Sequence, residues 1–442
     1  MLFAVLLFGL SVRANSPGAG VATLAGTVAL GLWLWRASRH PPEEDGLPMP
    51  ERDEGRLFLG VLVLAVLGAL GWAPSAIGPS TQWLERMPAL VWGLMAVVVF
   101  VTRKRSDARR VAAVVTTATL GVTLLVGLAH LEHVGSLGLD VNLLHTAAAD
   151  ALATGENPYT DAVEVPDGAP TAEPGDTISG YPYPPITGLA YAAGEWVFSD
   201  PRFTSLICWL AVLGMVGASA IRRGDRRGLY GLLLMASVPG WPLVLRASWT
   251  EPLSLALLAV AFITWRRPGQ AGSSWGLALA SKQYFAVTAP LALLHRDGSW
   301  KRRLLVAIAA VVVTLVPALL IDFSAFWSAA VEFHTTTPPR PDSSNLIGIL
   351  PGLGIDWAPP SLLSLGVGAI VATSIGRFSR DRLTFVATMA FAVASSFLVS
   401  TQAFANYWFL VFGLCVLALT GTREDPFDPA HSRTSDRYRA HG

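Results

Sequence analysis

Residues 138–160 read GLDVNLLHTAAADALATGENPYT, and residues 180–185 read GYPYPP. Hydrophobic segments lie on both sides of this region. From His130 to Pro185 the chain carries nine Asp or Glu residues and no Lys or Arg. Because Lys and Arg in short loops favour the cytoplasmic side of a membrane, this region is predicted to face the opposite side.

The composition predicts that most of the chain is embedded in a membrane. Hydrophobic residues make up 52% of the 442 residues and charged residues only 14%, and the mean hydropathy is +0.49. A soluble domain carries about 25% charged residues. Apolar segments near the ~20 residues that cross a bilayer recur along the chain. The predicted fold class is all-α, a polytopic membrane helical bundle of about twelve transmembrane helices with re-entrant or interfacial segments.

The clear apolar segments are 1–12, 19–35, 57–72, 87–101, 111–129, 203–221, 229–245, 252–265, 304–321, 361–376, 383–400 and 405–420, with weaker ones at 186–198 and 274–294. The loops between them and the C-terminal tail hold 26 of the 32 basic residues on one side, which is therefore predicted to be cytoplasmic. Both termini fall on that side. The basic residues on the outer side are Arg13, Arg86, Arg202, Arg246, Lys282 and Arg340.

This topology constrains the two weaker segments. Since 203–221 already returns the chain to the cytoplasm, 186–198 is predicted to be an interfacial or re-entrant helix that does not span. The segment 274–294 begins and ends beside cytoplasmic basic residues, so it is predicted to form two half-helices that meet near Lys282. A lysine at membrane depth requires a cavity or a partner, although a lysine that snorkels from a helix end is the alternative.

The sequence predicts local structure within the region from His130 to Pro185. Apolar residues from Val141 to Thr154 recur at helical spacing and predict a helix that begins at Asp140. Asp140 is suited to capping that helix, and equally to accepting a proton from a substrate hydroxyl. His145, one turn further on, is the alternative base. The stretch after Tyr159 is rich in Pro, Gly and acidic residues and predicts a loop that closes over a substrate.

These features together resemble the GT-C superfamily of multi-pass membrane glycosyltransferases. The order of an acidic residue after a transmembrane helix, G-x-N-P-Y, a variable loop and Y-P-Y-P-P is most similar to polyprenyl-phosphate-mannose-dependent mannosyltransferases. W-T-E-P at 249–252, the Lys-containing hairpin and N-Y-W at 406–408 agree with that pattern. The resemblance covers about 111–421, which is predicted to be the catalytic membrane core with its extracytoplasmic loop at 130–185. It leaves 1–110 as an N-terminal bundle of about four helices and 422–442 as a disordered cytoplasmic tail.

The resemblance implies transfer of a sugar, mannose in that family, from a polyprenyl-phosphate donor to a cell-envelope glycan or glycolipid acceptor outside the cytoplasm. It places the catalytic general base at Asp140. Because Leu139 and Val141 flank Asp140, there is no paired carboxylate, and a divalent metal is possible but unassigned. No nucleotide-binding or nucleic-acid motif is present, so neither is predicted as a partner.

A lipid-linked anionic leaving group requires cations beside an apolar surface. Arg246, Lys282 and Arg340 are the candidates. Three tyrosines, Tyr159, Tyr181 and Tyr183, are candidates for stacking on sugar rings, with anchoring at the membrane interface as the alternative. The full set of predicted substrate-binding residues is His145, Tyr159, Tyr181, Tyr183, Arg246, Glu251, Lys282, Arg340 and Asn406.

Three other classes of function remain open at this point. A secondary transporter predicts inverted repeats and several ionisable groups at the membrane midplane. A non-catalytic scaffold or lipid-binding protein is the second class. The polymerases and ligases of lipid-linked glycans form the third, and they favour a large late outer loop with several arginines, whereas 322–360 holds only Arg340.

Overall fold

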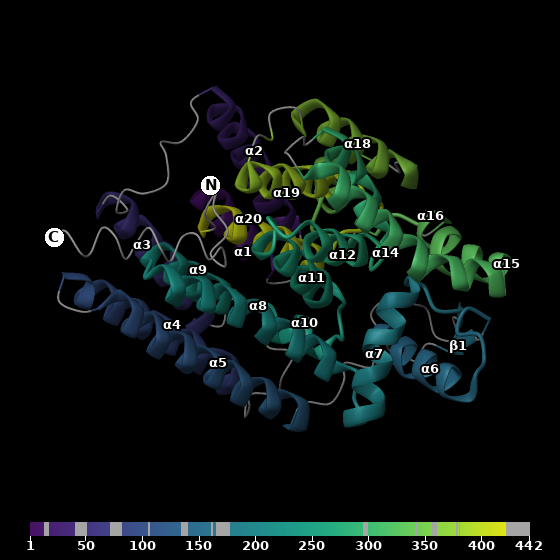
Figure 1. Cartoon of the computed structure of the whole chain (residues 1–442), viewed down its shortest axis with the longest axis horizontal. Helices are drawn as coiled ribbons and strands as arrows, with labels where there is room; N and C mark the ends of the chain where they lie inside the picture. Colours follow the sequence, from purple (N-terminus) through teal and green to yellow (C-terminus); the bar gives the residue numbers. More distant parts are fainter. Residues whose placement is uncertain are drawn as a thin grey trace.

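Helices form almost all of the part of the chain that the structure describes, as Figure 1 shows. The computed structural model describes residues 1–12, 17–39, 51–70, 82–104, 107–133, 140–160, 162–164, 177–294, 299–336, 338–340, 343–355, 360–376, 379 and 381–420. The predicted helical fold is confirmed. One two-stranded hairpin, which the sequence pattern did not indicate, interrupts the helices. The predicted tail at 422–442 lies outside the described residues.

Within the part of the chain that the structure describes, five helices are long and apolar enough to cross a bilayer. They are α2 (Pro17–Arg39), α4 (Gln82–Val101), α5 (Ala108–His133), α8 (Arg202–Arg223) and α14 (Trp300–Ile321). Five shorter helices are also apolar: α1 (Leu2–Ser11), α11 (Glu251–Ile263), α18 (Ser361–Gly376), α19 (Arg382–Leu398) and α20 (Ala405–Thr420). On α14, Val313 and Leu320 are 71% and 80% exposed, as expected of side chains that face lipid. The chain is a multi-pass membrane protein.

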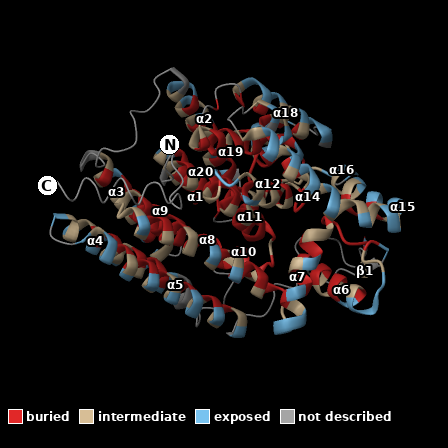
Figure 2. Ribbon diagram, viewed as in Figure 1, coloured by how far each residue is buried: buried red, intermediate tan, exposed pale blue. Residues whose placement is uncertain are grey.

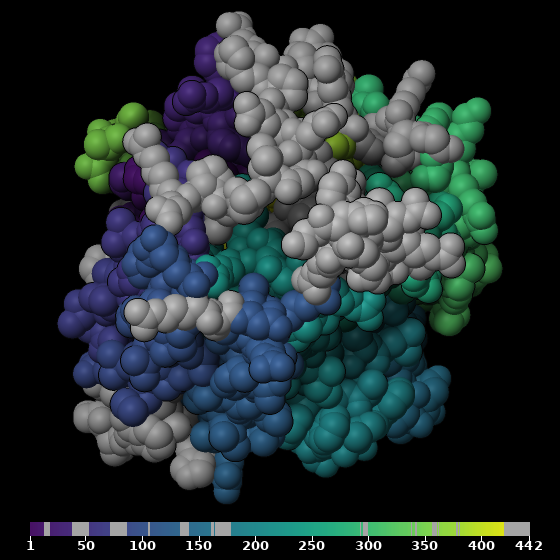
Figure 3. All heavy atoms as spheres, turned by 60° about the vertical axis from the view of Figure 1, so that its left-hand side comes forward, coloured from purple at the N-terminus to yellow at the C-terminus, as the bar shows by residue number. Residues whose placement is uncertain are grey.

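The N-terminal helices share their core with the end of the chain. Helix α1 packs against α20, and α2 packs against α19. The Phe8 and Trp408 rings stack with centroids 5.8 Å apart. Buried residues are concentrated in the centre of the bundle (Figure 2). On the face that Figure 3 shows, the blue N-terminal helices lie beside the teal middle of the chain. The domain boundary at residue 110 stays a prediction, but one hydrophobic core crosses it.

The segment predicted as a single span at 229–245 is divided into two helices. Helix α9 (Arg226–Ala236) ends before Pro239, and α10 (Trp241–Arg246) starts after Gly240. Proline lacks the backbone N–H and disfavours helical geometry in the residue before it. Gly240 lies so close to the end of α1 that an added Cβ would overlap the Val12 carbonyl oxygen. The break therefore accommodates close packing against the N-terminal helix.

A separate layer forms from the region that the sequence predicts to face the outer side. It contains α6 (Asp140–Thr154), the antiparallel strands β1 (Ala162–Glu164) and β2 (Thr177–Ser179), and α7 (Pro185–Phe198). The predicted helix after Asp140 is present and packs against α7. At 14 residues, α7 is about 21 Å long and shorter than the hydrocarbon core, in agreement with the predicted non-spanning helix. The centre of the predicted closing loop, 165–176, lies outside the described residues.

The predicted helix break near Lys282 is present. Helix α12 (Pro268–Leu279) packs against α14 and ends before Lys282, and the chain continues as the 3₁₀ helix η2 (Gln283–Thr288) and α13 (Ala289–Leu294). The remaining elements are α3 (Glu51–Ala69), η1 (Thr102–Lys104), α15 (Phe323–Trp327), the π-helical turn η3 (Ser328–Glu332), α16 (Phe333–Thr336), α17 (Leu346–Ile349) and η4 (Leu350–Leu353).

Candidate functional site

The candidate site lies where the YPYPP segment, residues 181–185, meets the helix break at Lys282. Lys282 has an extended backbone, with φ −151° and ψ 136°, between α12 and η2. The hydroxyl of Thr187 on α7 donates to the Ser281 carbonyl at 2.7 Å. This bond satisfies a carbonyl that the interrupted helix leaves open, and it fixes the layer of α6 and α7 to the break.

A buried ion pair occupies the centre of the site. Lys282 Nζ lies 3.4 Å from Glu251 Oε1, and the two side chains are 6% and 0% exposed. Glu251 is the first residue of α11, where a carboxylate is favoured by the helix dipole. The hydroxyl of Tyr284 also donates to Glu251 Oε1, at 3.4 Å. The structure thus joins W-T-E-P to the Lys-containing hairpin, two motifs that the sequence singled out separately.

Aromatic rings surround the ammonium group of Lys282. Its Nζ lies 4.3 Å from the ring centroid of Tyr183 and 5.8 Å from that of Tyr284. Both distances are within the range of a cation–π attraction. The ring of Tyr407 on α20 lies 5.6 Å from the ring of Tyr284, which extends the aromatic wall toward the last helix.

His145 connects α6 to two other segments. Its Nε2 lies 3.2 Å from the Ser248 carbonyl, which only accepts, so Nε2 carries the hydrogen. Nδ1 of the neutral ring then accepts from the Tyr181 hydroxyl at 2.8 Å. Burial lowers the pKa of His145 to about 3. Because both ring nitrogens are engaged within the protein, His145 is a poorer candidate for the base than the sequence suggested.

The three predicted tyrosines are buried and contact one another. The Tyr159 hydroxyl donates to the Tyr183 carbonyl at 3.1 Å, and the rings of Tyr181 and Tyr183 lie edge to face at 5.4 Å. Phe326 on α15 packs edge to face on Tyr159 with centroids 5.0 Å apart. Tyr159 and Tyr181 therefore stabilise the segments around the site, whereas the Tyr183 ring faces the Lys282 cation.

The Pro182 carbonyl receives two hydrogen bonds from different segments. Gln283 Nε2 donates at 2.8 Å, and His334 Nε2 on α16 donates at 2.8 Å. Gln283 also donates to the Ala330 carbonyl at 2.6 Å. These bonds hold the YPYPP segment between η2 and the segment after α14.

Three predicted residues lie in neighbouring segments. Arg246 ends α10, five residues before Glu251. The Arg340 guanidinium lies 4.8 Å from the ring centroid of Phe404, and its backbone N–H donates to the Thr401 carbonyl. Asn406 is buried on α20, and its Oδ1 has no hydrogen-bond partner among the described residues. These contacts attach Arg340 to residues 401–404.

Asp140 is the first residue of α6, as the sequence predicts. Its side chain lies outside the described part of the chain, so its role as general base stays a prediction. Within the described residues, no group of three or more His, Cys, Asp and Glu side chains is arranged to hold a metal ion.

Several residues of the site were missed by sequence reasoning. Ser248 adopts a left-handed conformation, with φ 54°, and its hydroxyl donates to Asn142 Oδ1 at 2.5 Å. The Tyr191 ring stacks on the His145 ring with centroids 3.9 Å apart, and its hydroxyl donates to the Trp249 carbonyl. Ser248 directly precedes the W-T-E-P motif, and this position is its one signal in the sequence.

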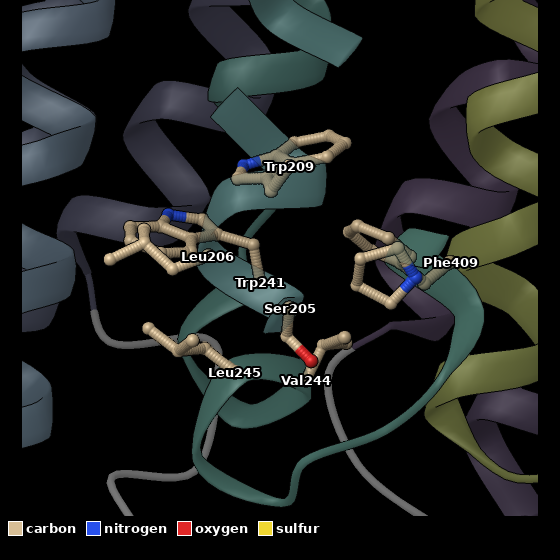
Figure 4. Close-up of a pocket in the computed structure, with 8 residues that line it drawn as sticks. Ser205, Leu206, Trp209, Trp241, Val244, Leu245 and Phe409 are labelled. Carbon is tan, nitrogen blue, oxygen red and sulfur yellow. The ribbon is translucent and has the colours of Figure 1, made fainter. Parts of the chain in front are cut away.

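A small apolar pocket lies beside the first turn of α11. Figure 4 shows its lining, with Trp241 and Leu206 on one side, Phe409 on the other and Trp209 above them. Pro252, the residue after Glu251, also lines this pocket. An apolar space therefore adjoins the helix end that carries the buried carboxylate.

No protein-family model and no curated protein matches this chain. Among solved structures, the chain is similar to the crystal structure of ArnT from Cupriavidus metallidurans bound to undecaprenyl phosphate. The sequence identity is 16%, the TM-score is 0.47, and the alignment covers 73% of this chain. The chain spans 62% of the length of the ArnT chain that it matches.

Proposed function

We propose that the chain is an integral membrane glycosyltransferase of the GT-C type. It transfers a sugar, mannose by the resemblance of its motifs, from a polyprenyl-phosphate-linked donor to a cell-envelope glycan or glycolipid. The reaction takes place on the extracytoplasmic side, and both termini are cytoplasmic. The observation that carries this proposal is the buried Lys282 cation, which lies between Glu251 and Tyr183 where the YPYPP segment meets a broken helix.

The chemistry of the donor matches this arrangement. Its phosphate is an anion that must be bound at the edge of the lipid, because the polyprenyl tail stays in the membrane. The Lys282 ammonium has three donor hydrogens, and electrostatic attraction is stronger in a buried, low-dielectric site than in water. The helix break supplies the polar backbone that such a site requires at membrane depth.

The ion pair also argues for a functional rather than a purely structural role. Burying two charges costs several kcal/mol of desolvation, and hydrophobic residues of similar volume often give equal or greater stability. An ionisable pair inside a membrane bundle is therefore typical of a binding or catalytic site. This favours an enzyme over a non-catalytic scaffold.

The proposed reaction is an inverting substitution at the anomeric carbon of the donor sugar. Asp140 accepts the proton of the acceptor hydroxyl while the hydroxyl oxygen forms the new glycosidic bond. The bond between the anomeric carbon and the phosphate oxygen breaks, and polyprenyl phosphate leaves with the electron pair. Lys282 stabilises the charge on the departing phosphate, which needs no acid to leave.

Lipid analysis of whole cells tests this function directly. Cells that lack the protein are expected to accumulate a polyprenyl-phosphate sugar and to lose one class of envelope glycan. Expression of the wild-type chain should restore both, and expression of Lys282→Met should restore neither. Unchanged pools of lipid-linked sugars in the deletion strain would contradict the proposal.

A further inference from the structure

The two carboxylate oxygens of Glu251 have different surroundings. Oε1 lies 3.4 Å from Lys282 Nζ and accepts from the Tyr284 hydroxyl at 3.4 Å. Oε2 is buried and has no hydrogen-bond partner among the described residues. The hydroxyl of the preceding residue, Thr250, is likewise buried and without a partner in the described part of the chain.

An unpaired carboxylate oxygen at this depth calls for a hydrogen donor. A buried polar group left unsatisfied is destabilising, and more so when the group is charged. Lys282 and Tyr284 hold Oε1, which fixes the orientation of the carboxylate and leaves Oε2 directed elsewhere. The group that completes this site must therefore donate to Oε2 without displacing Lys282.

The chemistry of a lipid-linked sugar identifies that donor group. The phosphate offers only acceptor oxygens and is repelled by a carboxylate, and the polyprenyl chain offers neither donors nor acceptors. The hydroxyls of the sugar are the hydrogen donors of the molecule. They lie next to the phosphate in the donor, just as Glu251 lies next to Lys282 in the protein.

We propose that Glu251 Oε2 accepts a hydrogen bond from a hydroxyl of the donor sugar and so distinguishes a sugar-bearing polyprenyl phosphate from the bare lipid phosphate. This inference rests on the proposed function. Lys282 binds the phosphate, which both lipids have, and Glu251 binds the sugar, which only the donor has. The same pairing favours release of the lipid product after transfer, because that product retains the phosphate and has lost the hydroxyls.

Binding measurements on the full chain in nanodiscs test this assignment. The probes are undecaprenyl phosphate and its mannosyl and glucosyl derivatives, without any acceptor, so that only a hydroxyl of the donor sugar is present. The wild-type chain is expected to bind at least one glycosylated lipid more tightly than the bare lipid. Glu251→Gln should reduce that preference by about tenfold or more, since the bond to a charged acceptor is lost. Its affinity for bare undecaprenyl phosphate should stay the same or rise, because Lys282 loses its carboxylate partner.

A matched control is available in a second buried glutamate. Glu54 on α3 accepts from the Tyr230 hydroxyl at 3.4 Å and lies 3.8 Å from Arg226, so Glu54→Gln also weakens a buried ion pair. It should leave the lipid preference unchanged. If Glu251→Gln fails to fold, Thr250→Val, which keeps the side-chain shape but removes the neighbouring unpaired hydroxyl, should likewise reduce the preference for the glycosylated lipid. A wild-type chain that binds the bare and glycosylated lipids equally, or a Glu251→Gln chain that keeps the preference, overturns the assignment. Failure to bind any of the lipids overturns the proposed function itself.

Discussion

Tyr181 donates a hydrogen bond of 2.8 Å to Nδ1 of His145, and this bond joins the YPYPP segment to α6. The opposite ring nitrogen of His145 donates to the Ser248 carbonyl, just before α11. One neutral imidazole therefore connects the helix that begins at Asp140 with the segments that carry Tyr183 and Glu251. The relative position of the proposed base and the Lys282 cation depends on this connection.

Removing the Tyr181 hydroxyl tests the connection. Tyr181→Phe should lower the free energy of unfolding by about 0.5–1.5 kcal/mol, the usual net contribution of one hydrogen bond. Denaturant unfolding of the purified chain in detergent measures the effect. In a His145→Ala background the same substitution should cost clearly less, because the partner is already gone. Equal costs in both backgrounds would show that the bond contributes nothing.

The buried histidines predict a loss of stability in acid. Burial lowers the pKa of His145 to about 3 and that of His334 to about 4, whereas the unfolded value is about 6.5. Between these values the unfolded chain binds protons that the folded chain does not, so stability should fall as the pH falls from about 6.5 toward 4. Thermal unfolding between pH 7.5 and 4.5 measures the slope.

His334→Gln is the control for this pH effect. Its amide N–H can replace Nε2 as donor to the Pro182 carbonyl but does not titrate in this range. The variant should therefore show a shallower loss of stability in acid than the wild-type chain. An identical slope would exclude His334 as a contributor.

A double substitution separates the structural and functional roles of the ion pair. Lys282→Met alone should destabilise the fold by about 3–5 kcal/mol, because it leaves Glu251 as an unpaired buried charge. Adding Glu251→Gln should restore much of that stability without restoring sugar transfer. Denaturant unfolding and a transfer assay on the same preparations measure both effects. Recovery of transfer in the double variant would remove Lys282 from the proposed mechanism.

The role of Asp140 as general base predicts a severe loss of rate with little loss of stability. Asp140→Asn should reduce transfer by about 10²- to 10⁴-fold, whereas loss of a helix cap costs only about 0.5–2 kcal/mol even for the harsher alanine replacement. Asp150→Asn, on the exposed side of the same helix, is the matched control and should keep normal activity. Near-normal transfer by a well-expressed Asp140→Asn chain would identify Asp140 as a cap.

Cysteine labelling tests the predicted orientation. In a background with Cys208 and Cys415 replaced by alanine, a cysteine at Gly168 should react with an impermeant reagent in intact cells. A cysteine at Ser435 should react only after permeabilisation, because the C-terminal tail is predicted to be cytoplasmic. The reverse pattern would place the acidic outer region in the cytoplasm.

The sequence by itself determined the membrane class, most helices and the break at Lys282. Long apolar runs can satisfy their backbone hydrogen bonds in lipid only as helices, so composition and length suffice for this inference. The helix after Asp140 followed from the spacing of its small and apolar residues. The only sign in the sequence that 229–245 is divided into two helices was Pro239-Gly240. The break accommodates contact with Val12, which lies more than 200 residues away in sequence.

Only the tertiary structure decided which polar groups meet. Glu251 begins α11 and Lys282 lies in the break after α12. Nothing in local periodicity relates one carboxylate to one particular ammonium group. The same holds for His145, whose two hydrogen bonds reach residues 36 and 103 positions away. Residue type indicates which side chains can carry charge or donate hydrogens, whereas their partners depend on how the helices pack. The unpaired oxygen of Glu251 became visible only once its neighbours were in place.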